Sequence, residues 1–192
     1  MKVGLTGGIG CGKSTVLRMC AERGALVVES DAIVRELLAT DQEVIQSVRE
    51  CFGDGVVDGE GKIDRARLGS MVANDSDKLS RLESILHPIV RRVWTRKVAE
   101  QDTLAVVEIP LLFEKNLQEL FDLTVCVASS PQVQMKRLRA RGLSDSQIQW
   151  RQQRQLPLPR KMELADVVLL NNGTLQHLNE QLDLLFDQWG AE

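Results

Sequence analysis

A short glycine-rich run near the start of the chain constrains the fold more than any other stretch. It reads Gly7-Gly8-Ile9-Gly10-Cys11-Gly12-Lys13-Ser14-Thr15, and it lies between a mostly apolar segment at 3–6 and a helical pattern at 16–21. This is the pattern G-x-x-x-x-G-K-[ST] of a P-loop, in its usual strand–loop–helix setting. Glycines let the backbone curl so that its N–H groups point at phosphate oxygens. The run therefore predicts a nucleoside triphosphate site.

Each polar residue of this run has a predicted role. Lys13 provides a positive charge for the outer phosphates, and the hydroxyl of Ser14 can ligate a magnesium ion. The start of the following helix adds free N–H groups and the positive end of its dipole. Cys11 is interpreted as a small residue that the turn tolerates. We expect the segment 10–15 (Gly10, Cys11, Gly12, Lys13, Ser14, Thr15) to bind ATP with Mg²⁺.

The bulk composition is that of one globular domain. The chain has 192 residues, 43% of them hydrophobic, and a net charge of −3, which argues against a general nucleic-acid or membrane binder. Its four cysteines show no C-x-x-C spacing, which favours reduced thiols. The first strand begins at residue 2, without a signal peptide before it. We expect a cytoplasmic protein that is a monomer or a weak homo-oligomer, with no nucleic-acid or membrane partner.

Five apolar runs have the near-continuous hydrophobicity of strands buried in a parallel sheet. Helical patterns separate them, as in a doubly wound α/β fold. We therefore predict a P-loop three-layer α/β fold with a five-stranded parallel sheet, and a single domain over 1–192. The predicted strands are Lys2–Thr6, Ala25–Glu29, Leu104–Ile109, Leu123–Ala128 and Val167–Leu170.

The gap between the second and third strands is too long for one crossover. It runs from Asp31 to about Thr103, and its second half has apolar residues at helical spacing. Pro88 is predicted to kink this helix or to divide it in two. We interpret the region as a helical substrate-binding insert at about 60–100.

A basic stretch follows the fourth strand. Between Lys136 and Lys161 there are eight lysines or arginines and one acid, Asp145. Arg137 and Arg141 are one helical turn apart, and Gly142 and Ser144 give a helix stop and a new N-cap. A solvated charged face or RNA binding would also explain the charge. We favour an arginine-rich helical lid at about 136–160, since the aromatic residues of an RNA-binding surface are absent apart from Trp150.

The type of phosphate chemistry depends on residues outside the loop. Asp58-Gly59-Glu60-Gly61 resembles the D-x-x-G of a GTPase, but no N-K-x-D motif follows, and the run reads as a turn. A kinase needs a base at the carboxyl end of a strand. Asp31 fits this position, although it could also be an N-cap. Arg35, one turn later, could hold an anionic substrate or pair with Asp31. Glu108 could serve magnesium through water or be a buried hydrogen-bonding partner.

With these motifs in place, the chain resembles the dephospho-coenzyme A kinase family over nearly its whole length. The phosphate loop alone fits many enzymes, whereas the Leu-His-Pro and Pro-Leu-Leu-Phe-Glu segments are much more specific. The matching pieces are 4–15, Ser30–Arg35, Phe52-Gly53, Ile63–Arg65, Leu86–Arg91, Pro110–Glu114, Arg137–Arg141, Arg151–Gln155, Ala165-Asp166 and Asn171–Gly173.

The resemblance implies transfer of the γ-phosphoryl group of ATP to the ribose 3′-hydroxyl of dephospho-coenzyme A. It implies that Asp31 is the general base, that Arg137 and Arg141 belong to the lid, and that His87 and Arg91 help to bind the coenzyme A part. Together with Lys13 and Arg141 as charge-neutralising groups, and Arg35 on the substrate, this completes the expected site. The expected partners are thus the two small-molecule substrates.

The chain departs from the family pattern in two places. Family members often have Asp-Ala-Asp where this chain has Glu29-Ser30-Asp31, which leaves the role of the first acid open. Arg154 stands where a small residue is common. His87 also has a simpler interpretation, as a cap of the turn before Pro88. A kinase of another hydroxyl or nucleotide acceptor and an ATP-binding module without phosphotransfer are the alternatives.

Overall fold

The computed structural model describes residues 1–73 and 75–189. Residue 74 of the predicted insert and residues 190–192 of the predicted domain lie outside the described residues. The described part forms two compact units, one made of Met1–Val28 and Gln101–Glu192 and the other of Glu29–Glu100. The first unit holds the sheet and its helices, and the second is helical.

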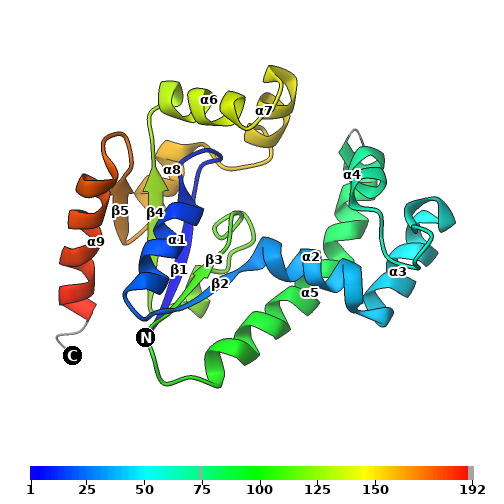
Figure 1. Cartoon of the computed structure of the whole chain (residues 1–192), viewed down its shortest axis with the longest axis horizontal. Coiled ribbons are helices and arrows are strands. Elements are labelled where there is room, and N and C mark those ends of the chain that lie inside the picture. The colour runs from blue at the N-terminus through cyan, green and yellow to red at the C-terminus, as the bar shows by residue number, and fades with distance from the viewer. Residues whose placement is uncertain (74, 190–192) are drawn as a thin grey trace. The chain divides into compact units, whose positions relative to one another are not determined.

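Within the described ranges, the strands form the predicted five-stranded sheet. All of their residues belong to the first unit except Glu29, the last residue of β2. The order of the sheet is β2-β3-β1-β4-β5, and the β1–β3, β1–β4 and β4–β5 pairings are parallel (Figure 1). The predicted class and sheet are confirmed. The strands are β1 (Lys2–Gly7), β2 (Leu26–Glu29), β3 (Ala105–Glu108), β4 (Leu123–Ala128) and β5 (Val167–Leu170).

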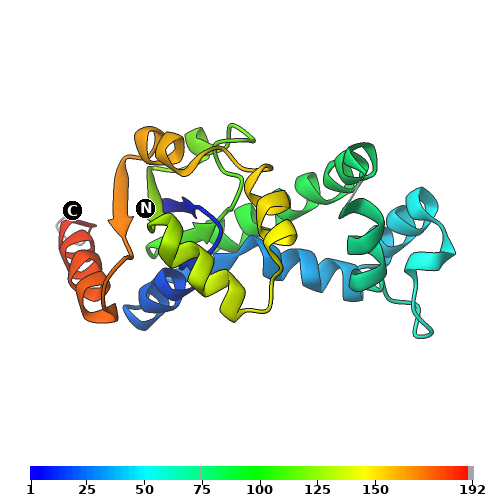
Figure 2. The same cartoon turned by 90° about the horizontal axis from the view of Figure 1, so that it is seen from above.

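Helices cover both faces of the sheet. Helix α1 (Lys13–Glu22) packs with α9 (Leu175–Trp189), while α8 (Leu158–Leu164) contacts β1 and β4. Figure 2 shows α8 on the opposite side of β1 from α1. The strands β1, β3 and β4 are almost wholly buried, which explains their continuous apolar sequences. Their core includes Val3, Leu5, Val125, Val127 and Leu169.

The position of β1 locates the site of this unit. From β1 the chain passes to β2, on one side of β1. From β3 it later crosses to β4, on the other side of β1. The loop after β1 therefore lies at the carboxyl end of the sheet, at the point where the strand order reverses, which is where open α/β sheets bind ligands.

The second unit contains α2 (Ser30–Thr40), α3 (Gln42–Phe52), α4 (Arg65–Ala73) and α5 (Ser76–Ala99). Helix α5 crosses Pro88 without a break, so the predicted division of this helix does not occur. Buried side chains recur every fourth residue on both sides of the proline, and this stripe packs on the other helices of the unit. That packing outweighs the roughly 3 kcal/mol that an interior proline costs. The stripe is Leu82, Leu86, Val90, Trp94 and Val98.

The remaining elements of the first unit are α6 (Pro131–Ala140), α7 (Asp145–Gln152) and the short 3-10 turn Gln118–Leu120, while the turn Asp54–Val56 belongs to the second unit. Among the described residues, no helix combines the length and the apolar character that crossing a membrane would require.

Candidate active site

The phosphate loop is shaped by glycines that a side chain could not replace. Gly7, at the end of β1, has φ 143°, and a Cβ there would lie 2.2 Å from the carbonyl oxygen of Val127 on β4. Gly12 has φ 92°, and its Cβ would lie 2.3 Å from Nδ2 of Asn171. Both residues combine a left-handed backbone with a close neighbour, so the loop can follow this path only with glycine.

Helix α1 starts directly at the end of this loop. Its N-cap is Gly12, which has no side chain to accept from the first N–H groups of the helix. Those groups and the helix dipole are therefore directed at the loop, where an anion would bind. Nζ of Lys13 lies 3.2 Å from the carbonyl oxygens of both Gly7 and Gly8, and the side chain of Ser14 is exposed beside it. The predicted ATP-binding segment thus spans the end of the glycine-rich loop and the first turn of α1.

A buried polar network lies against the outer side of the loop. Asn171, just after β5, donates from Nδ2 to the carbonyl of Cys11 at 2.9 Å. Ser129, just after β4, donates from Oγ to the carbonyl of Asn171 at 2.7 Å. Arg137 on α6 donates to Oγ of Ser129 at 3.0 Å and to Oδ1 of Asn171 at 3.2 Å, and it also reaches the carbonyls of Gly10 and Cys11 at 3.4 Å.

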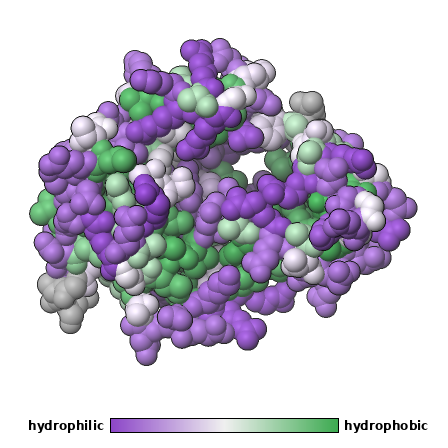
Figure 3. All heavy atoms as spheres, in the orientation of Figure 1, coloured by the Kyte–Doolittle hydropathy of each residue, from purple (hydrophilic) through white to green (hydrophobic). Residues whose placement is uncertain are grey.

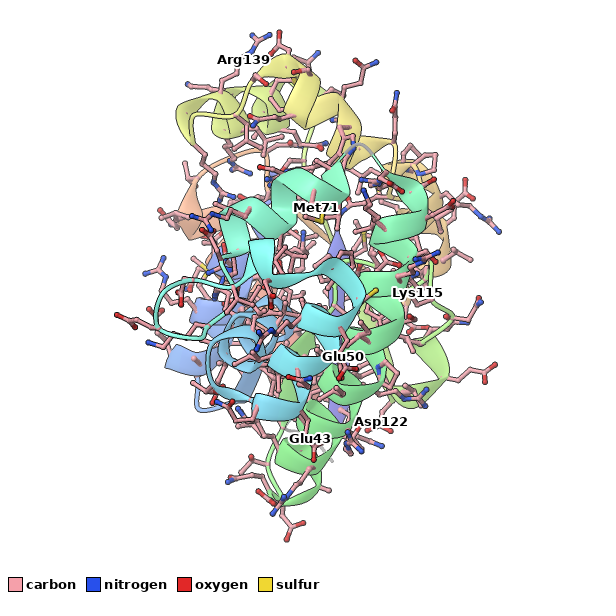
Figure 4. The ribbon with its side chains drawn as sticks, turned by 90° about the vertical axis from the view of Figure 1, so that its right-hand side faces the viewer. Glu43, Glu50, Met71, Lys115, Asp122 and Arg139 are labelled. Atoms are coloured by element: carbon pink, nitrogen blue, oxygen red, sulfur yellow. The ribbon has the colours of Figure 1, made fainter. Side chains whose placement is uncertain are left out.

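Helices α6 and α7 form the predicted helical pair. Gly142 has φ 80° and ends α6, and Ser144 caps α7 in a capping box with Gln147, so both predicted signals are confirmed. Figure 3 shows mainly hydrophilic residues over this pair. Arg139 makes two 3.0 Å hydrogen bonds to Asp145, and it points away from the body of the molecule in Figure 4. Arg137 lies against the phosphate loop, whereas Arg141 is exposed at the end of α6.

The segment that leaves α7 is fixed by a buried ion pair. Lys161 on α8 has no exposed side-chain surface, and its Nζ lies 2.8 Å from Oε1 of Glu114 and 2.7 Å from the carbonyl of Pro110. The same carboxylate oxygen accepts from the backbone N–H of Leu156 at 2.7 Å. Before this segment, the Arg154 guanidinium stacks 3.8 Å from the centre of the Trp150 ring. The pair connects α8 to the loop after β3.

The second unit holds the other predicted site residues, and it corrects two expectations. Helix α2 starts at Ser30, so Asp31 lies in its first turn with an exposed side chain and is not its N-cap. Arg35 pairs with Glu29 at 3.4 Å and not with Asp31, because Glu29 extends from the strand end beside the first turns of α2. His87 and Arg91 are exposed on α5, four residues apart and so on one face of the helix.

Comparison with known proteins identifies the family. The family model for dephospho-CoA kinase matches residues 1–177. The chain belongs to the dephospho-CoA kinase family. It is similar to a dephospho-CoA kinase of Streptomyces avermitilis, with 39% identity over 185 residues that cover 95% of this chain and 90% of the relative. The predicted family is therefore confirmed.

Solved structures agree with this membership. A Thermus thermophilus protein of known structure superposes with a TM-score of 0.84 and 32% identity, covering 98% of this chain and 97% of the other. A shikimate kinase of Bacteroides thetaiotaomicron shares the fold at 16% identity, with a TM-score of 0.53 and coverage of 97% and 98%. This second likeness shows that the two proteins share a fold.

The sequence did not point to several residues of the site. Asn171 stands only within a family motif, and no motif of the sequence includes Ser129. Ser129 follows the carboxyl end of β4, and Asn171 follows that of β5. A polar residue just after a buried parallel strand is the sequence signal that could have pointed to each of them. Glu108, at the end of β3, is buried with 8% of its surface exposed.

The thiol of Cys11 is shielded from solvent within this loop. Its side chain is fully buried, and burial raises its pKa above the ordinary value, although the charge of Lys13 opposes this. Burial likewise raises the pKa of Cys20 to about 11 and that of Cys126 to about 12. These three thiols are protonated at neutral pH, and only thiolates react with alkylating agents. Cys51 is exposed on α3.

We therefore expect only one of the four cysteines to react with a thiol reagent while this protein is folded. Titration with a chromogenic disulfide at pH 7.5 should count a single thiol, and mass mapping should place it at Cys51. All four should react in denaturant. Modification of Cys11 in the native protein would show that the loop opens to solvent.

Proposed function

We propose that the protein transfers the γ-phosphoryl group of ATP to the ribose 3′-hydroxyl of dephospho-coenzyme A, which gives coenzyme A and ADP in the last step of coenzyme A synthesis. The family match over residues 1–177, which contains the complete phosphate loop, is the observation that supports this function.

The phosphate loop provides for the nucleotide side of the reaction. The backbone N–H groups of the segment 10–15 and the start of α1 bind the phosphate chain, and Lys13 neutralises charge on the transferring group. Arg141, exposed at the end of α6, approaches the same group when the lid closes, while Arg137 contacts the nucleotide from its place against the loop. A closed lid excludes water, which would otherwise compete with the acceptor hydroxyl.

Mg²⁺ fits the donors available here. Ser14 offers an exposed hydroxyl in the first turn of α1, and Mg²⁺ usually takes few protein ligands, with phosphate and water oxygens completing its octahedron. In the described part of the chain no group of three or more His, Cys, Asp or Glu side chains is arranged to hold a metal ion, so the phosphates provide the other anionic ligands. When bound, Mg²⁺ neutralises charge on the β- and γ-phosphates.

The second unit provides for the acceptor. The exposed carboxylate of Asp31 accepts the proton of the 3′-hydroxyl. His87 and Arg91, on one face of α5, contact the coenzyme A part, and Arg35 adds a positive charge near the acceptor. We place this insert at about 60–100, within the helical unit Glu29–Glu100, and the lid at about 136–160.

A coupled assay of ADP release tests this function. We expect release to depend on dephospho-coenzyme A, and the product to be coenzyme A by mass. Stimulation by a different hydroxyl acceptor alone would assign the chain to another kinase activity. ATP binding without release in the presence of any acceptor would leave an ATP-binding module and would contradict the proposal.

The proposed setting is the cytoplasm, where the four free cysteines stay reduced. We propose a monomer or a weak homo-oligomer that acts on its small-molecule substrates without a nucleic-acid or membrane partner. Sedimentation velocity over a range of concentrations measures the assembly state.

A further inference from the structure

We propose that Asn171 is a positioning residue of the phosphate loop, which sets the direction of the Cys11–Gly12 peptide and so aims the N–H of Gly12 at bound phosphate. This inference rests on the proposed function, since it concerns how the same loop binds the phosphate chain of ATP. The argument starts from how firmly Asn171 itself is held.

The amide of Asn171 has a fixed place and a fixed orientation. The residue is 3% exposed, and its backbone N–H donates to the carbonyl of Ala128 at 2.8 Å, which anchors it beside the end of β4. Its backbone carbonyl accepts from Ser129 at 2.7 Å. In the side chain, Oδ1 accepts from Arg137 at 3.2 Å, which leaves Nδ2 directed at the loop.

The target of Nδ2 is the carbonyl oxygen of Cys11, at 2.9 Å. Nη1 of Arg137 also reaches this oxygen, at 3.4 Å, while the single hydroxyl proton of Ser129 is donated to the carbonyl of Asn171 at 2.7 Å. Asn171 is therefore the closest donor to the carbonyl of Cys11. A trans peptide directs its C=O and its N–H to opposite sides. Because the carbonyl of Cys11 is held outward, the N–H of Gly12 must point inward, to the concave side where phosphate binds.

Gly12 also shows how closely Asn171 supports the loop. A Cβ at residue 12 would lie 2.3 Å from Nδ2 of Asn171. The amide therefore occupies the space that a side chain at residue 12 would need, and it contacts the peptide that it orients. An unsupported loop would have to order this peptide when ATP binds, and that ordering would reduce affinity.

The test compares binding of ATP with binding of inorganic tripolyphosphate, which has a phosphate chain but no base or ribose. Calorimetry on the full chain, without acceptor, gives both dissociation constants. Loss of the one donor in Asn171→Ala should weaken both ligands by the same factor, about tenfold. Ser129→Ala, which removes a second member of the network, should act in the same direction and by a smaller factor.

Gln181→Ala is the matched control. Gln181 on α9 makes two 2.9 Å hydrogen bonds to the backbone of Leu170, the residue before Asn171, so its loss loosens the same strand end without touching the loop. Both dissociation constants should stay at the wild-type value in this variant. An equal loss of affinity in the control would overturn the inference in favour of a general effect of strand stability.

Three other results would also overturn it. If Asn171→Ala weakens ATP but not tripolyphosphate, the residue contacts the base or ribose. If the variant lowers the melting temperature with both affinities intact, its role is structural. If tripolyphosphate does not bind the wild type, the loop is not a preformed phosphate cradle. If the wild-type protein released ADP at a rate that did not depend on the acceptor, the proposed function would be contradicted. The comparison of ATP with tripolyphosphate binding would still stand.

Discussion

Asp31→Asn should reduce kcat by about 10²–10⁴-fold, the usual contribution of a general base. The substitution keeps the size of the side chain and removes only its ability to take the proton of the acceptor hydroxyl. The residue lies in the first turn of α2, where a carboxylate adds only about 0.3–1 kcal/mol of helix stability, so the protein should stay folded. Steady-state kinetics with dephospho-coenzyme A, together with calorimetric ATP binding, make the measurement.

Asp41→Asn is the matched control for this experiment. Asp41 is the N-cap of α3 and accepts from the backbone N–H of Val44 at 3.0 Å, a bond that asparagine can also accept. We expect an unchanged kcat in this variant. A kcat near the wild-type value in Asp31→Asn would mean that the carboxylate only complements the dipole of α2, and the general base would have to be sought elsewhere.

Lys161→Met should lower the free energy of unfolding by about 3–5 kcal/mol, because it removes one partner of a buried ion pair and leaves the other charged. The side chain of Glu114 is 13% exposed, so water cannot replace the lost ammonium group efficiently. The carbonyl of Pro110 also loses its 2.7 Å donor. Urea unfolding, followed by fluorescence and by circular dichroism, measures the change.

Two further variants separate the charge from the contact. Lys161→Met combined with Glu114→Gln removes both charges and should recover a large part of the lost stability. Arg160→Met breaks the exposed ion pair with Glu163 on the same helix, and it should cost no more than about 1 kcal/mol. Equal costs for Arg160→Met and Lys161→Met would contradict a special role for the buried pair.

The elements of the fold follow from local patterns. Continuous apolar runs located the five strands, and Gly142 and Ser144 located the break between α6 and α7. These signals can be read from the sequence for two reasons. A strand that is buried on both faces is apolar along its own length, and a helix cap is formed by residues next to the helix end. Where a local signal met a tertiary one, the division of a helix that it allowed did not occur. Pro88 stays inside α5, because the buried stripe on either side of it packs in the second unit.

The sequence did not determine which side chains pair with one another. Arg35 pairs with Glu29 and not with Asp31, and Asp31 is not a cap, although the sequence left both of these contacts open. Spacing along a helix shows which side chains share a face, but the choice between two nearby carboxylates depends on where the strand end places each of them.

The sequence by itself determined the phosphate loop and the family, because the glycines, Lys13 and Ser14 act within one contiguous stretch, and the motif segments follow in order along the chain. Only the tertiary structure decided what supports that loop. The bond from Asn171 to Cys11 joins residues 160 apart, and the pair of Lys161 with Glu114 joins α8 to the loop after β3. Such contacts form when strands align their carboxyl ends, and no local pattern records which polar residue will then meet which backbone carbonyl.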